Sequence, residues 1–290
     1  MSFESDLKTH AARIGAALDA YLGVFGDLPV AQGMRYATNG GKRLRGFLVM
    51  SSAQLFQDPR EGHLLAAAAI ECIHAYSLVH DDLPCMDDDD LRRGQPTVHR
   101  KWDEATAVLV GDALQTFAFE LLARDEVHPD PRVRLDLVSS LAKASGAHGM
   151  VLGQAQDIAA ETAGRPLTLD EITDLQANKT GALIRWSAEA GAILGGADPG
   201  PLRAYSSALG LAFQIADDIL DVTGDETKTG KRVGKDSDAG KATFVSLLGL
   251  DGARRKAREL IAEAVDALSM YDARADNLRQ AAMFVVSREF

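Results

Sequence analysis

Two groups of aspartates stand out because each ends a long apolar stretch of the chain. The groups consist of Asp81, Asp82 and the run 87–90, and of Asp217, Asp218 and Asp221. Crowded carboxylates repel one another and are costly to remove from water, and a divalent cation offsets both costs. Oxygen-only ligands suit Mg²⁺, which usually bridges one or two carboxylates to phosphate oxygens. The two groups therefore predict magnesium sites that act on a phosphorylated substrate.

The spacing within each group predicts how the carboxylates are arranged. Asp217 and Asp221 are four residues apart, so on a helix they share a face, and Gln214 lies one turn earlier on the same stripe. In the first group, Pro84 should end or bend the preceding helix. Asp81 and Asp87 would not converge on a straight helix, so the bend must bring Asp87 back toward Asp81.

Simpler interpretations exist for each acidic group taken alone. An aspartate-rich run is usually a solvated face, and residues 87–90 by themselves fit that interpretation. A calcium loop needs alternating acids, a central glycine and a terminal glutamate, and neither group has that pattern. Two Asp-Asp pairs that each end a long apolar helix are not explained by surface decoration, so we favour metal binding.

Basic residues follow a pattern that fits two bound anions. The segment Gly40-Gly41-Lys42-Arg43-Leu44-Arg45 opens a predicted helix, where free amides and the same-face cations Lys42 and Arg45 favour an anion. Arg92 and Arg93 directly follow the first acidic group, and Lys179-Thr180-Gly181 opens another helix. Together they predict one anion held through metal and a second held mainly by arginine and lysine.

Apolar residues recur mostly at helical spacing, so we expect helices to position all these residues. The predicted helices cover about 7–22, 42–56, 61–83, 99–124, 132–146, 148–160, 168–178, 180–194, 201–222, 251–269 and 273–286. A capping box at Thr168 and Glu171 marks one start. The helices 61–83 and 201–222 are apolar nearly all round, which is typical of central helices. No linker divides the chain, so the sequence predicts one all-α domain over residues 1–290.

Composition excludes several other classes of protein. The chain has 290 residues and a net charge of -11, which argues against a nucleic-acid or anionic-membrane partner. Cys72 and Cys85 are too few for a disulfide framework, and no signal-peptide core opens the chain. The conspicuous apolar run 64–70 is far shorter than the roughly 20 residues of a membrane span. We expect a soluble, cytoplasmic protein.

Two further features concern the organisation of the chain. The glycine-rich segment 224–240 follows the second acidic group directly, which favours a lid over the site. Lys42 precedes Asp81 by 39 residues and Lys179 precedes Asp217 by 38. This near-repeat fits two related halves, and coincidence remains an alternative.

The residues 71–82, continued by Leu91-Arg92-Arg93-Gly94, resemble the first aspartate-rich motif of the trans-isoprenyl diphosphate synthases. The four-residue spacer between Asp82 and Asp87 is similar to the bacterial and plastid types. The segments 40–45, 179–180, 213–221 and 230–232 match the other motifs of this family in order. The resemblance covers nearly the whole chain. It implies an all-α bundle around a deep central cavity, a homodimer, and three Mg²⁺ ions for which Mn²⁺ can substitute.

The resemblance also implies a role for each matching residue. Metal ligands would be Asp81, Asp82, Asp87, Asp217, Asp218 and Asp221. The allylic diphosphate would be held by Arg92, Lys179 and Lys231, and the diphosphate of isopentenyl diphosphate by Gly41, Lys42, Arg45, His74 and Arg93. Thr180 and Gln214 would lie beside the allylic cation that forms when the diphosphate leaves. The departing diphosphate would accept the final proton.

The residues just before Asp81 bear on product length. Ser77 and Tyr76 lie four and five positions earlier, about 6 to 7.5 Å deeper on a helix. A tyrosine at that depth can close the floor of the cavity, and this pair resembles that of bacterial farnesyl diphosphate synthases. We therefore expect isopentenyl diphosphate to be condensed with dimethylallyl or geranyl diphosphate to a fifteen-carbon product.

Three alternatives remain open at this point. A twenty-carbon (geranylgeranyl diphosphate) synthase differs only in product length. A non-catalytic subunit of a heteromeric synthase would usually have damaged aspartate motifs, and both motifs here are intact. A terpene cyclase would not need the second, basic site at Lys42, Arg45 and Arg93. Arg288, near the end of the chain, has no clear part in the site.

Overall fold

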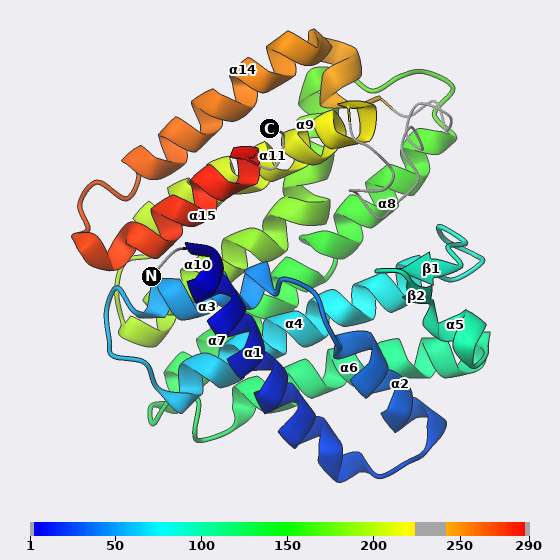
Figure 1. Cartoon of the computed structure of the whole chain (residues 1–290), viewed down its shortest axis with the longest axis vertical. Helices are drawn as coiled ribbons and strands as arrows, with labels where there is room; N and C mark the ends of the chain where they lie inside the picture. The colour runs from blue at the N-terminus through cyan, green and yellow to red at the C-terminus, as the bar shows by residue number, and fades with distance from the viewer. Residues whose placement is uncertain (1–2, 224–241, 288–290) are drawn as a thin grey trace. The chain divides into compact units, whose positions relative to one another are not determined.

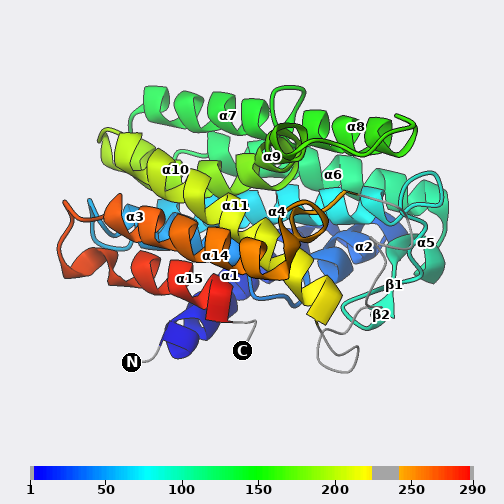
Figure 2. The same ribbon diagram turned by 90° about the horizontal axis from the view of Figure 1, so that it is seen from above.

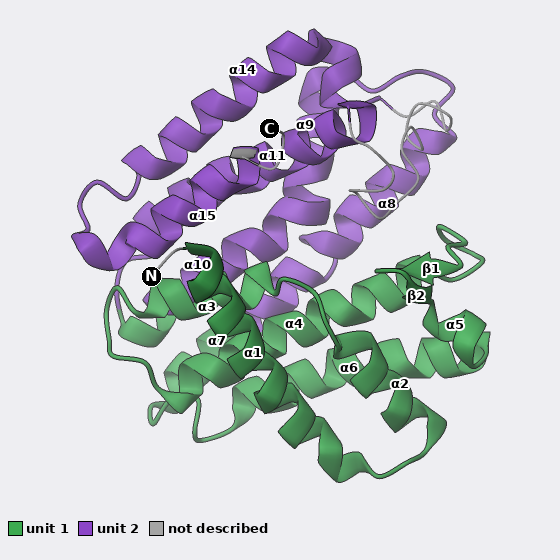
Figure 3. Cartoon of the chain, viewed as in Figure 1, with its two compact units in different colours: residues 1–138, 193–196 green, residues 139–192, 197–290 purple. Residues whose placement is uncertain are grey.

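The computed structural model describes residues 3–223 and 242–287, and these form two compact units (Figures 1 and 3). Unit 1 comprises residues 1–138 with 193–196, and unit 2 comprises 139–192 with 197–290. Within the described residues the only β structure is a hairpin of β1 (Leu91–Arg92) and β2 (Gln95–Pro96), in which Leu91 pairs with Pro96. The predicted all-α fold is confirmed. The single domain and the central cavity stay predictions.

Unit 1 is built around one buried helix. Its helices are α1 (Phe3–Leu22), α2 (Pro29–Thr38), α3 (Leu44–Ala53), α4 (Glu61–Asp81), α5 (Val98–Lys101), α6 (Glu104–Ala123) and the first half of α7 (Pro131–Ser145). The stretch of α4 from Leu65 to Ile70 is wholly buried, and α4 packs chiefly against α3 and α6. The prediction that this helix is central is confirmed.

Unit 2 is built around α11, which packs mainly against α14. Besides the rest of α7 it contains α8 (Met150–Glu161), α9 (Leu169–Gln176), a π-helical turn (Ala177–Gly181), α10 (Ala182–Gly195, whose last residues belong to unit 1), α11 (Gly200–Thr223), α14 (Phe244–Asp266) and α15 (Asp276–Ser287). Figures 1 and 2 show α11, α14 and α15 side by side. The apolar face of α11 is buried among them.

Several helix boundaries differ from the predicted ones for local reasons. The predicted helix 99–124 is two helices, because Asp103 accepts a hydrogen bond from the amide of Thr106 (2.7 Å) and starts α6 anew. The helix α3 starts at Leu44, since Arg43 has a φ of 51°. The sequence missed α2, whose first residue is Pro29. The predicted capping box is confirmed: Glu171 accepts from the amide of Thr168 (2.8 Å), and the Thr168 hydroxyl accepts from that of Glu171 (3.3 Å).

In the part of the chain that the structure describes, two helices are long and apolar enough to pass for membrane spans. They are α4, in which 78% of the most apolar window is buried within the protein, and α6, in which 44% is. The burial of α4 marks it as a core helix. The apolar but half-exposed α6 presents part of its surface outward.

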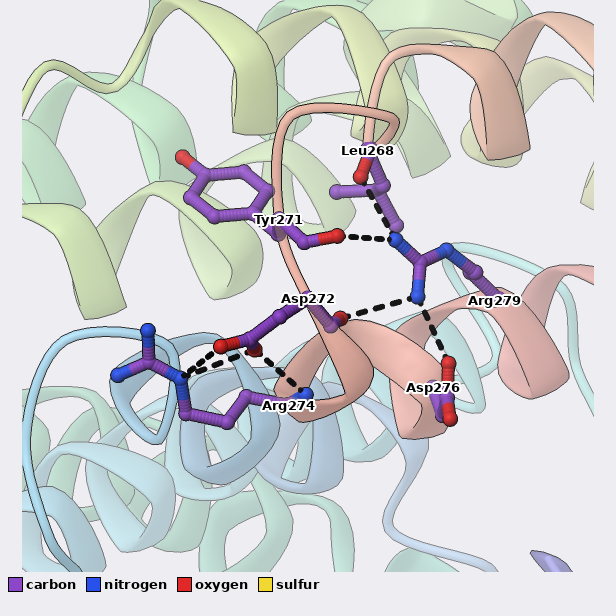
Figure 4. A network of polar contacts seen from close by, with 6 residues as sticks. All are labelled: Leu268, Tyr271, Asp272, Arg274, Asp276 and Arg279. Atoms are coloured by element: carbon purple, nitrogen blue, oxygen red, sulfur yellow. Dashed lines mark hydrogen bonds and ion pairs between the residues drawn. The ribbon is translucent and has the colours of Figure 1, made fainter.

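The connection from α14 to α15 is fastened by one arginine, shown in Figure 4. The guanidinium of Arg279 donates to the carbonyls of Leu268 (2.8 Å), Tyr271 (2.7 Å) and Asp272 (3.1 Å). It also donates to the carboxylate of Asp276 (2.7 Å). The arginine thus ties together three carbonyls that lie beyond the end of α14 and the first residue of α15.

Candidate active site

The first acidic group lies where α4 ends and the chain turns back. The amide of Asp87 donates to the carbonyl of Asp81 (2.8 Å), and that of Asp88 donates to the carbonyl of Leu83 (3.2 Å). Asp88 adopts a left-handed conformation with φ 50°. The chain therefore turns back over the end of the helix, as the spacing predicted, and Asp87 lies beside Asp81.

Asp82 differs from its neighbour Asp81 in its surroundings. Asp82 is only 3% exposed, whereas Asp81 is half-buried. The Nε of Arg92 donates to both carboxylate oxygens of Asp82 (2.9 and 3.3 Å), and its Nη2 donates as well. Burial raises the pKa of Asp82, and Arg92 opposes that shift. The β-hairpin after the motif thus delivers Arg92 to Asp82.

The basic residues of unit 1 gather around the start of α3. Arg93 donates from Nη1 to the carbonyl of Asn39 (3.2 Å). A side chain at Gly41 would lie 2.8 Å from the Arg93 guanidinium, and its φ of 78° also requires glycine. Arg45 and His74 are half-buried and Lys42 is exposed. Arg92, Arg93, Gly40 and Gly41 line part of a cavity of about 290 Å³ within this unit.

In unit 2 the π-helical turn carries two of the predicted residues. Lys179 forms an ion pair with Asp157 of α8 (2.7 Å), and Thr180 donates from its hydroxyl to Gln214 Oε1 (3.3 Å). A side chain at Gly153 would lie 2.1 Å from the amide nitrogen of Lys179, so α8 touches the backbone of this turn. Single π turns inside helices are frequent at functional sites.

The second acidic group continues this polar chain along α11. Gln214 donates to Oδ1 of Asp218 (3.0 Å), and the amide of Phe244 donates to Oδ2 (2.8 Å). Asp218 is 4% exposed, while Asp217 and Asp221 are half-buried. Both acidic groups therefore have the same arrangement: the second aspartate is buried on protein donors, and the first is more accessible.

Tyr76 and Ser77 have distinct surroundings in α4. Tyr76 is buried at 6% exposure, and its ring lies edge-to-face against that of His80 at 5.8 Å. Burial raises its pKa to about 12, so the phenol is neutral. The Ser77 hydroxyl donates back to the carbonyl of His74 (3.0 Å). The aromatic ring, not the serine, is the bulky group at this level of the helix.

The donor set fits Mg²⁺ in its chemistry. Each acidic group offers accessible carboxylates, Asp81 with Asp87 and Asp217 with Asp221, and Mg²⁺ typically takes one or two carboxylates beside phosphate oxygens. Among the described residues, no three acidic, histidine or cysteine side chains converge as a complete metal-binding group. A phosphorylated ligand would have to supply further oxygens. Lys231, Arg288 and the whole of the predicted lid 224–240 lie outside the described residues.

Sequence reasoning missed three contributors to these arrangements. They are Asp157, which pairs with Lys179; the amide of Phe244, which binds Asp218; and Glu71, whose Oε1 accepts from the amide of Gly46 (2.8 Å). A signal existed for Glu71, since an acid inside the apolar stretch of α4 needs a partner. The amide of Phe244 carries no signal in its residue type.

Comparison with known proteins identifies the family. The model of the family described as "Polyprenyl synthetase" matches residues 29–281. The chain is 47% identical over 277 residues to farnesyl diphosphate synthase of Escherichia coli, with 92% of each chain covered. It is also 40% identical over 277 residues to a chloroplastic geranylgeranyl pyrophosphate synthase of Capsicum annuum, covering 94% of this chain and 75% of that one.

Solved structures agree with this. An FPP/GFPP synthase of Zymomonas mobilis superposes with a TM-score of 0.88 at 48% identity, covering 97% of this chain and 99% of that one. A geranyltransferase of Helicobacter pylori, complexed with magnesium and isoprenyl diphosphate, superposes with a TM-score of 0.82 at 33% identity, covering 99% and 97%. The chain belongs to the polyprenyl synthetase family. The family predicted from the sequence motifs is confirmed.

Proposed function

We propose that this protein is a prenyltransferase that condenses isopentenyl diphosphate head-to-tail with dimethylallyl or geranyl diphosphate and releases farnesyl diphosphate. The observation that carries the proposal is the 47% identity to the Escherichia coli farnesyl diphosphate synthase over 92% of both chains. The buried ring of Tyr76 supports the fifteen-carbon product.

Magnesium fits the proposed reaction, with Mn²⁺ as a substitute. Asp81, Asp87, Asp217 and Asp221 would hold the ions, and the Helicobacter pylori relative was crystallised with magnesium. When bound, Mg²⁺ would supply positive charge that offsets the charge of the leaving diphosphate. Asp82 and Asp218, predicted as further ligands, already accept hydrogen bonds from Arg92, Gln214 and the Phe244 amide. We assign them a supporting role that orients these groups.

The remaining residues would bind and orient the two substrates. Arg92, Lys179 and Lys231 hold the allylic diphosphate, and Gly41, Lys42, Arg45, His74 and Arg93 hold that of isopentenyl diphosphate. The Thr180 hydroxyl and Gln214 are hydrogen-bonded to each other and would present oxygen atoms to the allylic cation. Preorganised dipoles of this kind stabilise developing charge without reorganising. The departing diphosphate takes the proton, since no side chain in our assignment serves as the base.

The assembly and location of the protein are parts of the same proposal. We propose a homodimer, with part of the exposed surface of α6 in the interface, and a cytoplasmic location. The partners are isopentenyl diphosphate and the allylic diphosphates, with no nucleic acid and no stable insertion into a membrane.

Product analysis tests the proposal directly. The purified protein is incubated with Mg²⁺, labelled isopentenyl diphosphate and geranyl diphosphate, and the dephosphorylated products are sized. We expect a fifteen-carbon product. A mainly twenty-carbon product would keep the reaction but favour the geranylgeranyl alternative, and no elongation would favour the non-catalytic subunit or a cyclase.

Replacing Tyr76 tests the floor of the cavity. Tyr76→Ala removes the ring and should move the main product from fifteen to twenty or more carbons. Tyr76→Phe, which keeps the ring, should leave the product at fifteen carbons. Unchanged product length in Tyr76→Ala would mean that another residue sets the limit.

A further inference from the structure

Glu71 is a buried carboxylate for which the reaction described above has no use. It lies on α4 between residues that are wholly buried, and its own exposure is 8%. An ionised carboxylate in such a place is costly unless it is hydrogen-bonded and paired with charge. The groups that contact the Glu71 carboxylate should therefore indicate its role.

The hydrogen-bonding partner of Glu71 is the start of another helix. Gly46, the third residue of α3, donates its amide to Glu71 Oε1 (2.8 Å). Arg43, which precedes α3, makes no side-chain cap of its own. A carboxylate at this position satisfies an unpaired amide and faces the positive end of the helix dipole. Glu71 thus caps α3 from a neighbouring helix.

The close approach of the two helices depends on the glycine. A side chain at Gly46 would lie 2.7 Å from Ile14 Cδ1, 3.2 Å from the carbonyl oxygen of Ala67 and 3.3 Å from Glu71 Cγ. The glycine lets α3 approach α4 closely enough for the carboxylate to reach the amide. The hydrogen bond between Gly46 and Glu71 therefore depends on the absence of a side chain at position 46.

Three guanidinium groups act on the same carboxylate. Burial raises the pKa of Glu71, while the Gly46 amide and the charges of Arg45, Arg43 and Arg93 oppose the shift. Arg43 is anchored inward, since its Nη2 donates to the carbonyl of Thr38 (2.9 Å), and Arg93 donates to Asn39. One carboxylate cannot neutralise three arginines, so the cluster keeps a positive charge that suits a polyanion.

We propose that Glu71 is a positioning residue for the metal-independent diphosphate site. Its carboxylate fixes the start of α3 and attracts the guanidinium groups of Arg45 and Arg93, so that both are oriented before the ligand arrives. The ligand is an organic diphosphate without a bound metal ion. This inference rests on the proposed function, in which that ligand is isopentenyl diphosphate.

The test compares Glu71→Gln with a matched control. The glutamine keeps the shape and can still accept from Gly46, but it removes the charge. We expect KM for isopentenyl diphosphate to rise about tenfold or more, with kcat within about threefold and KM for geranyl diphosphate within about twofold. The control, Glu189→Gln, removes a carboxylate bonded to Arg203 (2.7 Å) outside the proposed site and should leave all three constants unchanged.

A second variant separates positioning from folding. Glu71→Asp restores the charge with a shorter side chain, so its KM for isopentenyl diphosphate should lie between those of the wild type and Glu71→Gln. In Glu71→Gln, equal increases in KM for isopentenyl diphosphate and KM for geranyl diphosphate would show a purely structural role. A lower melting temperature with an unchanged KM for isopentenyl diphosphate would show the same. If Glu71→Gln does not fold, a KM for isopentenyl diphosphate in Glu71→Asp equal to that of the wild type would overturn the proposal.

A binding experiment distinguishes failure of this inference from failure of the proposed function. Isopentenyl diphosphate is titrated calorimetrically into metal-free protein in EDTA. We expect binding to the wild type and about tenfold weaker binding to Glu71→Gln. That result supports the role of Glu71 even if the wild type makes no prenyl product, which would refute only the proposed function. No binding to the metal-free wild type, or equal binding to both, would overturn the role of Glu71.

Discussion

Adjacent aspartates differ in their surroundings in both acidic groups, and the difference lies at the scale of single residues. Asp82 and Asp218 are buried on protein donors, whereas Asp81 and Asp217 are half-buried. Hydrogen bonds from Arg92 offset the cost of burying the Asp82 carboxylate. Those from Gln214 and the Phe244 amide offset the cost of burying Asp218. Each buried aspartate fixes a group that the proposed reaction needs.

We expect Asp82→Asn to reduce both activity and stability. Arg92 would lose its buried, hydrogen-bonded carboxylate partner and keep only the longer ion pair to Asp89 (3.7 Å). Hydrogen bonds to charged groups contribute about 1.5 to 3 kcal/mol. The value of kcat/KM for geranyl diphosphate should therefore fall about 10- to 100-fold in steady-state assays. The free energy of unfolding should fall by about 1 to 3 kcal/mol in denaturant titrations.

The control for this variant is Asp19→Asn, which changes an exposed aspartate on α1. Its effect on the free energy of unfolding should stay within about 0.5 kcal/mol. If Asp82→Asn were as active as the wild type, Arg92 would not depend on Asp82 for its position.

At the scale of elements, the π-helical turn between α9 and α10 presents Lys179 and Thr180 together. The turn is backed by α8, whose Gly153 leaves no room for a side chain beside the backbone of Lys179. The ion pair between Lys179 and Asp157 joins the same two elements. The orientation of the Lys179 side chain therefore depends on the close contact between α8 and the π-helical turn.

Gly153→Ala should displace the π-helical turn. The added methyl would overlap the backbone of Lys179, and overpacking of this kind costs about 1 to 3 kcal/mol of stability. Because misplacement by about 1 Å can cost on the order of 100-fold in rate, we expect kcat to fall at least about tenfold. The measurements are denaturant unfolding and single-turnover kinetics.

Gly23→Ala is the matched control, since a side chain there meets nothing within 4 Å. It should leave kcat unchanged. A fully active Gly153→Ala would show that the turn adapts without moving Lys179 out of position.

How far the sequence predicts these elements depends on where the information lies. The helix 61–83 and the capping box of Thr168 follow from local patterns, and both are confirmed by α4 and by the hydrogen bonds of Glu171. The π turn could not be predicted, because residues 177–181 fit the end of one helix and the start of the next equally well. Likewise, Glu71 is visible in the sequence, but its contact with Gly46 exists only once α3 and α4 pack.

At the scale of the whole molecule, the outward surface of α6 bears on assembly. Val108 and Leu109 are 41% and 56% exposed on a helix apolar enough to pass for a membrane span. Exposed apolar surface of this kind commonly marks a protein interface. A second copy of the chain would cover it in the proposed homodimer.

Sedimentation analysis checks this assembly. The wild type should sediment at twice the chain mass of 31.0 kDa. Leu109→Asp should raise the dimer dissociation constant at least about tenfold, because it places a charge in an apolar interface. Met270→Asp changes an exposed apolar residue in the α14–α15 connection and should leave the dimer intact. A monomeric wild type would contradict the proposal.

The fastening of α15 by Arg279 has a consequence for sequence divergence. Three of its four acceptors are main-chain carbonyls, those of Leu268, Tyr271 and Asp272. Main-chain acceptors survive replacement of the side chains that carry them. This fastening therefore places no demand on the side chains at these three positions as long as the path of the backbone is kept, whereas it does depend on position 279, since no other side chain offers so many donors in one plane.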